Sequence, residues 1–214
     1  MGEDFPVTIK SESRFKKLLR AYKLEAGMTV ILIVLYLVLH LVTGTALKKG
    51  NLLNVLQSSA PLLIMTMGQL VVVITGGIDL SVGSIYSLSG MCGVLVMLDT
   101  QSIAAGVLVA LGVGIVCGLI NGTLVAVLKI PPILATLGTL ELFGGVALVL
   151  TEGKPVSGLP PAFSTVFTAK VVGLVPIPLV VFLVCAAVAG FIVACTSFGR
   201  TILMLGTNDT AARF

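Results

Sequence analysis

The chain has 214 residues, of which 57% are hydrophobic and only 10% are charged, and its formal net charge is +4. Its mean hydropathy is +1.17, whereas an ordinary soluble domain carries about 25% charged residues. This composition excludes an ordinary soluble domain and gives no indication of a nucleic-acid partner. It predicts a protein that crosses a membrane several times.

The first 23 residues are polar and basic, and an apolar run over residues 24–47 follows them. A cleaved signal peptide has a shorter apolar core that ends at a small-residue cleavage site. This run is longer and has no convincing cleavage site, so we expect it to be an uncleaved first membrane span.

Five further apolar runs follow, and each is close to the roughly 20 residues that a helix needs to cross the hydrocarbon core. Barrel strands would alternate polar and apolar residues, which these runs do not. The sequence therefore predicts an all-α polytopic transmembrane bundle of about six spans. We expect a basic segment at 1–23, a membrane domain at 24–196 and a cytoplasmic loop at 197–214. The further runs cover residues 55–75, 80–98, 103–128, 133–150 and 176–196.

The distribution of basic residues predicts the orientation in the membrane. With a cytoplasmic N-terminus, nine of the 13 Lys and Arg residues fall in cytoplasmic segments and four fall outside. This bias follows the positive-inside rule. It places the Pro- and Gly-rich segment 151–175 outside the cytoplasm.

The junction between the second and third runs has the sequence GGIDLSVGS at residues 76–84. An ionisable side chain at membrane depth is costly and marks a function or a specific partner. Paired glycines permit a bend or a close approach. Two compatible roles stay open for Asp79: its carboxylate caps the third span by accepting from the N–H of Val82 or a neighbour, or it lines a path through the membrane.

The fourth run carries small residues at every fourth position, which form a smooth stripe on one helix face. We expect this stripe to be a packing seam against another helix. Its members are Gly106, Ala110, Gly114, Gly118 and Gly122.

Polar residues also stand in or beside the fourth and fifth runs. We expect Asn121 to make an interhelical hydrogen bond, and Pro131 and Pro132 suit the start of a helix. Glu141, near the middle of the fifth run, should face the bundle interior, be protonated or pair with a base.

The remaining reactive residue types form no site pattern. His40 has no metal-ligand spacing around it, so we expect packing or a hydrogen bond. The four cysteines stand in or beside apolar runs, and we expect neither a disulfide nor a metal site from them. The sequence has no Walker lysine loop, dinucleotide fingerprint or nucleophile elbow.

The last residues predict a turn at Gly206 and Asn208 and a short helix that begins near Thr210. Two interpretations stay open for this tail. It is either a plain helix end with a turn, or a docking element for a partner on the inner face.

Three motifs, in this order, resemble those of the permease subunits of bacterial ABC importers for ribose, xylose, galactose and related sugars. The first is GGIDLSVGS, the second runs from Asn121 through the two prolines to Thr139, and the third runs from Phe198 to Ala212. Together they extend from about residue 50 to the end of the chain.

The resemblance implies a multi-pass protein of the bacterial inner membrane with several partners. Two permease subunits, identical or different, would form the path, and a periplasmic sugar-binding protein would deliver the sugar. A separate cytoplasmic ATPase would bind ATP and drive alternating access, so this chain would hold no cofactor and would not be an enzyme. The family's expected ATPase contacts match Gly206, Thr207, Asn208, Ala211 and Ala212.

Sugars are neutral and rich in hydroxyls, so a path for them needs hydrogen-bonding groups and weak contacts rather than a strong charge. The path candidates in this chain are Asp79, Ser81, Ser84, Asn121, Thr136 and Thr139.

Two features depart from the family pattern. Gly144 precedes Gly145 where the family often has an Arg, and the chain is shorter than a family member, which indicates a C-terminally truncated permease. Two other functions remain as alternatives: an ion-coupled secondary transporter that uses Asp79 or Glu141, and a membrane scaffold that transports nothing.

Overall fold

The computed structural model describes residues 22–171 and 175–207. Most of the predicted basic N-terminal segment lies outside these residues, as do Asn208, Ala211 and Ala212 of the predicted ATPase contacts. Six of the described helices are long and apolar enough to cross a membrane. The prediction of an all-α polytopic protein with six spans is therefore confirmed, and the chain is a multi-pass membrane protein.

The observed spans differ from the predicted ones mainly at the ends of the first two. The first ends early because Gly44 adopts a left-handed φ of 64° and its N–H donates to the carbonyl of His40. The second begins six residues before its prediction, since its polar first turns are helical. The spans are α2 (Lys23–Thr43), α3 (Lys49–Ile74), α4 (Val82–Thr100), α5 (Ile103–Gly122) continued by the π-helical turn η1 (Thr123–Val127), α6 (Pro132–Leu150) and α8 (Ile177–Cys195).

The chain forms two compact units that divide between Asn54 and Val55. In the first unit, the turn after α2 is held by the N–H of Leu47, which donates to Nδ1 of His40 at 3.2 Å. Nδ2 of Asn51 donates to the carbonyl of Ala46 at 2.9 Å. The prediction that His40 makes a structural hydrogen bond is therefore confirmed.

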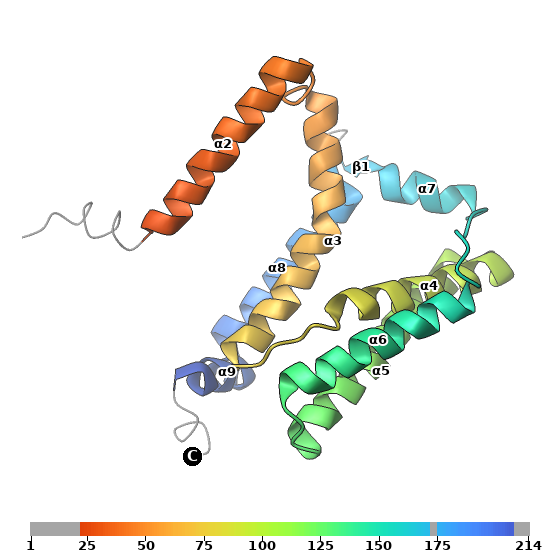
Figure 1. Cartoon of the computed structure of the whole chain (residues 1–214). Coiled ribbons are helices and arrows are strands. Elements are labelled where there is room, and N and C mark those ends of the chain that lie inside the picture. The colour runs from red at the N-terminus through yellow and green to blue at the C-terminus, as the bar shows by residue number, and fades with distance from the viewer. Residues whose placement is uncertain (1–21, 172–174, 208–214) are drawn as a thin grey trace, which may run out of the picture. The chain divides into compact units, whose positions relative to one another are not determined.

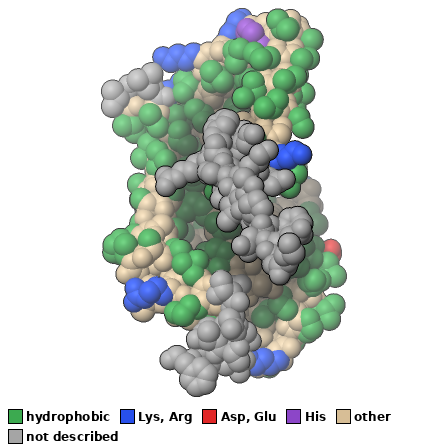
Figure 2. Space-filling model, turned by 90° about the vertical axis from the view of Figure 1, so that its left-hand side faces the viewer, with side chains coloured by type: hydrophobic (Ala, Val, Ile, Leu, Met, Phe, Trp, Pro, Cys, Tyr) green, Lys and Arg blue, Asp and Glu red, His purple; other side chains and the backbone are tan. Residues whose placement is uncertain are grey.

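In the second unit, α4, α5 and α6 pack side by side (Figure 1). Their shared core is small and apolar, as expected for helices that contact one another in lipid. Its buried members are Leu88, Cys117, Phe143 and Ala147. The remaining surface of these helices is largely apolar. Figure 2 shows another face of the molecule, on which hydrophobic side chains make up much of the coloured area.

Two helices outside the spans are not among the predicted elements. The helix α7 (Pro161–Thr168) lies in the segment predicted as a long external loop, and its Phe163 and Phe167 rings stack at 6.3 Å. A two-stranded antiparallel pair, β1 (Lys170–Val171) and β2 (Val175–Pro176), then leads into α8. The helix α7 is short and amphipathic and the strand pair is short and bounded by a turn, so a search for apolar runs detects neither.

The other unpredicted helix is α9 (Ser197–Thr207), which follows α8 directly. The hydroxyl of Thr196 accepts from the N–H of Gly199 at 3.1 Å, so Thr196 caps this helix. The prediction of a turn at Gly206 is wrong, because Gly206 lies within α9.

Candidate functional site

The segment between α3 and α4, residues 75–81, is irregular backbone bounded by a glycine turn. Gly76 has a φ of 77°, a conformation that side chains with a Cβ rarely adopt. The N–H groups of Gly76 and Gly77 donate to the carbonyls of Val73 and Val72 at 3.0 and 2.9 Å. The two glycines therefore end α3 and turn the chain back toward it, as the paired-glycine pattern predicts.

The Asp79 carboxylate binds Ser81, the residue that directly precedes α4. Its Oδ1 accepts from the N–H of Ser81 at 2.7 Å and from the Ser81 hydroxyl at 2.6 Å. Ser81 is the N-cap residue of α4. The prediction that this carboxylate accepts from the N–H of Val82 or a neighbour is confirmed, with Ser81 as the donor, because α4 starts two residues later than predicted and Asp79 lies in the turn before it.

Three helices attach to this irregular segment through side-chain hydrogen bonds. Nε2 of Gln69, on α3, donates to the carbonyl of Asp79 at 3.1 Å. Nδ2 of Asn121, on α5, donates to Oγ of Ser81 at 2.7 Å. Oγ1 of Thr136, on α6, donates to the carbonyl of Ile78 at 3.2 Å. Irregular backbone at membrane depth needs such partners, since lipid supplies none.

These side chains form one connected set, which we call the polar cluster. Ser84 belongs to it because its hydroxyl donates to the carbonyl of Ser81 at 2.8 Å, and Thr139 donates to the carbonyl of Thr136 at 3.3 Å. The predicted interhelical bond of Asn121 is confirmed. The polar cluster consists of Gln69, Asp79, Ser81, Ser84, Asn121, Thr136 and Thr139.

The structure thus brings together all six residues predicted as path candidates. Five of them, all but the half-buried Asp79, are buried, and they bond to one another or to nearby backbone. The polar cluster therefore joins the ends of α4, α5 and α6, while its role in lining a path stays a prediction. Gln69 was not predicted, although an amide inside an apolar run was a visible signal for a polar contact.

The backbone that leads from α5 to α6 also departs from regular helix. The π-turn η1 follows Asn121 after one residue, and the N–H of Leu128 donates to the carbonyl of Thr123 at 3.0 Å. Lys129 then has a φ of 58°. A π-turn is rare and is often found at functional sites. The helix α5, which carries Asn121, therefore ends in irregular backbone next to the polar cluster.

Small residues bring α4 and α5 into close contact at one end of the predicted seam. A Cβ added at Gly106 would lie 2.6 Å from the carbonyl oxygen of Gly93. No such neighbour lies within 4 Å of a Cβ added at Gly114, Gly118 or Gly122. Positions four apart rotate by about 40° around an α-helix, so the stripe winds away from α4. For those three glycines the packing seam stays a prediction.

Glu141 is exposed in the described chain, so the first of its three expected states, facing the bundle interior, is wrong for these helices, while protonation or pairing with a base stays a prediction. It stands on the opposite side of α6 from the buried Thr139 and Phe143, because positions two apart point in nearly opposite directions on a helix. Of the predicted ATPase contacts, Gly206 and Thr207 form the end of α9.

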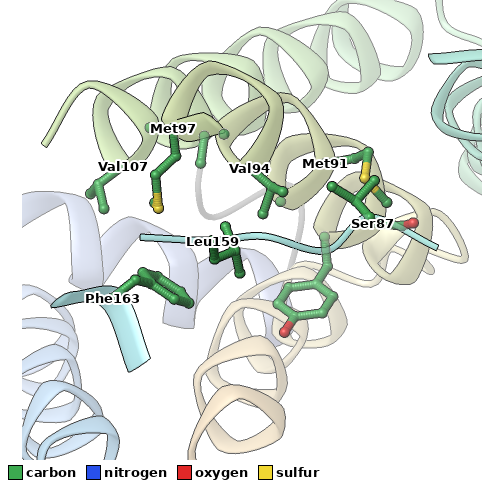
Figure 3. A pocket seen from close by; sticks show the side chains of 13 residues that line it. Ser87, Met91, Val94, Met97, Val107, Leu159 and Phe163 are labelled. Carbon is green, nitrogen blue, oxygen red and sulfur yellow. The ribbon is translucent and has the colours of Figure 1, made fainter. Parts of the chain in front are cut away.

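Two cavities in the second unit are lined by residues outside the polar cluster. One, of about 460 Å³, lies between α4, α5 and the segment before α7. Figure 3 shows Leu159 and Phe163 facing Met97, Val94 and Val107 across it. Because its walls are largely apolar, this cavity suits an apolar occupant better than a solute rich in hydroxyls.

The second cavity, of about 520 Å³, follows α5 between α4 and α6. Each of the three helices contributes to its wall a residue that lies one helical turn from a member of the polar cluster. These pairs are Leu88 with Ser84, Cys117 with Asn121, and Phe143 with Thr139. The polar cluster therefore lies directly beyond one end of this cavity.

Residues 51–214 match the protein family described as "Branched-chain amino acid transport system / permease component". The chain belongs to this family. The matched region contains every member of the polar cluster, the π-turn and α9. The family resemblance predicted from the three motifs is confirmed.

Curated relatives agree with the family. The chain is 36% identical over 196 residues to the "Probable ABC transporter permease protein y4mJ" of Sinorhizobium fredii, covering 92% of this chain and 59% of that protein. It is 38% identical over 192 residues to the "Autoinducer 2 import system permease protein LsrC" of Salmonella typhi, covering 88% and 54%. LsrC of Yersinia pestis is 34% identical with the same coverage. The chain therefore spans less than two-thirds of the length of these relatives, and no solved structure matches it.

Proposed function

We propose that the chain is the membrane-spanning permease subunit of an ATP-driven importer for a monosaccharide or a related small polyol. The observation that carries the proposal is the family match over residues 51–214, which coincides with the helices that build the polar cluster. The names of the relatives, one of them an import system permease, point the same way. The chain itself would catalyse no reaction.

The chemistry of the polar cluster suits a neutral, hydroxyl-rich solute. Its groups are hydroxyls, amides and one carboxylate, which exchange hydrogen bonds without the tight grip of paired charges. In the structure the bonds of Gln69, Asn121 and Thr136 hold the 75–81 segment against α3, α5 and α6. Separation of the helix ends would expose the buried hydroxyls of Ser81, Ser84, Thr136 and Thr139 to a passing solute, as alternating access requires.

The proposed orientation puts the N-terminus in the cytoplasm, in a bacterial inner membrane. The polar cluster would then lie at the cytoplasmic end of the spans, and α7 would lie outside. The described part of α9 would stand on the cytoplasmic side, where Gly206 and Thr207 would contact a separate ATPase that binds ATP. A periplasmic sugar-binding protein and a second permease subunit, identical or different, would complete the importer.

Uptake of radiolabelled solutes tests this proposal. A bacterium that lacks its own pentose and hexose importers would express the chain with the ATPase and binding protein encoded beside it. We expect uptake of a monosaccharide that is lost when the ATPase carries an inactive Walker lysine, and copurification of the chain with the ATPase. Uptake of leucine but of no sugar would overturn the substrate class. Ion-driven uptake without the ATPase would replace the proposal with a secondary transporter.

A further inference from the structure

Two amide oxygens in the polar cluster are buried and have no hydrogen-bond partner within the described part of the chain. They are Oε1 of Gln69 and Oδ1 of Asn121. The Asn121 side chain is well buried, with the residue only 7% exposed. A buried carbonyl oxygen without a donor destabilises the folded state, so natural structures rarely leave one unsatisfied without a functional reason.

The orientation of each amide is fixed by the group it donates to. Gln69 faces the carbonyl oxygen of Asp79, which only accepts, so the NH₂ must point there. Asn121 faces Oγ of Ser81, whose single proton already goes to the Asp79 carboxylate at 2.6 Å. Rotating either amide by 180° would place two acceptors against each other. The unpaired atoms are therefore carbonyl oxygens in both side chains.

The polar cluster has no spare hydroxyl to satisfy them. Each of its four hydroxyls donates its one proton to an acceptor within the unit, through the bonds of Ser81, Ser84, Thr136 and Thr139. The missing donors must therefore come from outside these side chains. The apolar cavity along α5 reaches Ile120, the residue before Asn121, and Cys117, one helical turn before it. The π-turn η1 begins two residues after Asn121.

We propose that Gln69 Oε1 and Asn121 Oδ1 are acceptor sites for hydroxyl groups of the transported solute. The inference rests on the proposed function and deepens it, because it assigns substrate contacts to two amides that also hold the 75–81 segment. A hydroxyl that binds either oxygen acts on the irregular backbone through the same side chain. Solute binding is thereby linked to the segment that joins α3 to α4.

Infrared spectroscopy of the permease in lipid nanodiscs tests the sites without requiring transport. Asparagine carrying ¹³C at its side-chain carbonyl would be incorporated, and the spectrum of an Asn121→Leu variant subtracted to isolate the Asn121 band. The solutes would be D-ribose, D-xylose, D-galactose and glycerol, with tetrahydropyran as a control that has no hydroxyl. We expect at least one hydroxylated solute to shift the band to lower frequency and tetrahydropyran to leave it unchanged.

Two results would overturn the inference. A band that is already at the hydrogen-bonded frequency and ignores every solute would show that resident water is the donor. A band at the free frequency that ignores every solute would show that nothing binds there. An Asn51→Leu difference spectrum provides the matched control, because Asn51 lies in the other unit and should not respond.

Variants at Gln69 separate its two functions. Gln69→Glu keeps an acceptor and loses the donor to the 75–81 segment, whereas Gln69→Met loses both. For a transported sugar we expect Gln69→Met to raise KM about threefold to tenfold above that of Gln69→Glu, the effect of one hydrogen bond. Equal KM values would count against the site. Uptake with an unresponsive band would leave the proposed function intact and remove only this inference. A responsive band without uptake would count against the proposed function and leave a hydroxyl-binding site that serves no transport.

Discussion

Substitution of Gly93 by Ala tests the closest helix contact in the second unit. The added Cβ would lie 2.7 Å from the carbonyl oxygen of Gly106 and 2.9 Å from Cβ of Ala110. Ordinary van der Waals contact begins at 3.4 Å, so α4 and α5 must move apart by about 0.7 Å at this point. The obstructing oxygen belongs to helix backbone and cannot rotate away, so the strain falls on the helix pair.

The expected cost follows from a matched control on the same helix. Gly90→Ala adds a Cβ with no neighbour within 4 Å, and both substitutions gain the same helix propensity of about 1 kcal/mol. Their difference therefore measures overpacking, which costs about 1–3 kcal/mol. We expect Gly93→Ala to lower the free energy of unfolding by that amount relative to Gly90→Ala.

Denaturant unfolding in mixed detergent–lipid micelles would measure the two free energies. The double variant Gly93→Ala, Ala110→Gly should recover part of the loss, since it removes one of the two clashes. Equal stability of the Gly93 and Gly90 variants would refute the conclusion that these small residues set the distance between α4 and α5.

Substitutions at three further positions test the polar cluster and the α8–α9 corner. Asp79→Asn should keep most of the stability and uptake because an amide oxygen still accepts from Ser81. Asp79→Leu should lose about 2–3 kcal/mol of unfolding free energy. Parent-like uptake by both variants would show that the side chain at position 79 is dispensable. Thr136→Val should lower the free energy of unfolding by about 1 kcal/mol more than Thr66→Val in the same assay, since of these two only Thr136 bonds outside its own helix. Equal losses would contradict a stabilising bond from Thr136 to Ile78. Gly199→Ala should disrupt the corner because its Cβ would overlap the backbone of α8. Gly190→Ala should not, and protease cleavage in α9 would compare them, with equal cleavage arguing against the corner.

Local signals in the sequence were sufficient to locate most of the membrane spans. The six apolar runs identified the spans to within a few residues, except at the start of α3, because hydrocarbon thickness sets helix length directly. The paired glycines predicted the turn after α3. The helices α7 and α9 were missed because each is short and only partly apolar, so neither differs enough in hydropathy from a loop.

The sequence by itself determined the class of protein, the spans and the family, since composition, run length and motif order are local properties of the chain. It also supplied six polar residues without indicating that they meet. Only the tertiary structure decided that Asp79, Asn121 and Thr136 belong to one hydrogen-bonded cluster, because that depends on α4, α5 and α6 packing with these ends together. The same packing decided that the stripe on α5 contacts α4 only near Gly106, and that two buried amide oxygens lack donors. Pairing between distant residues is set by helix packing, which no single run of sequence encodes.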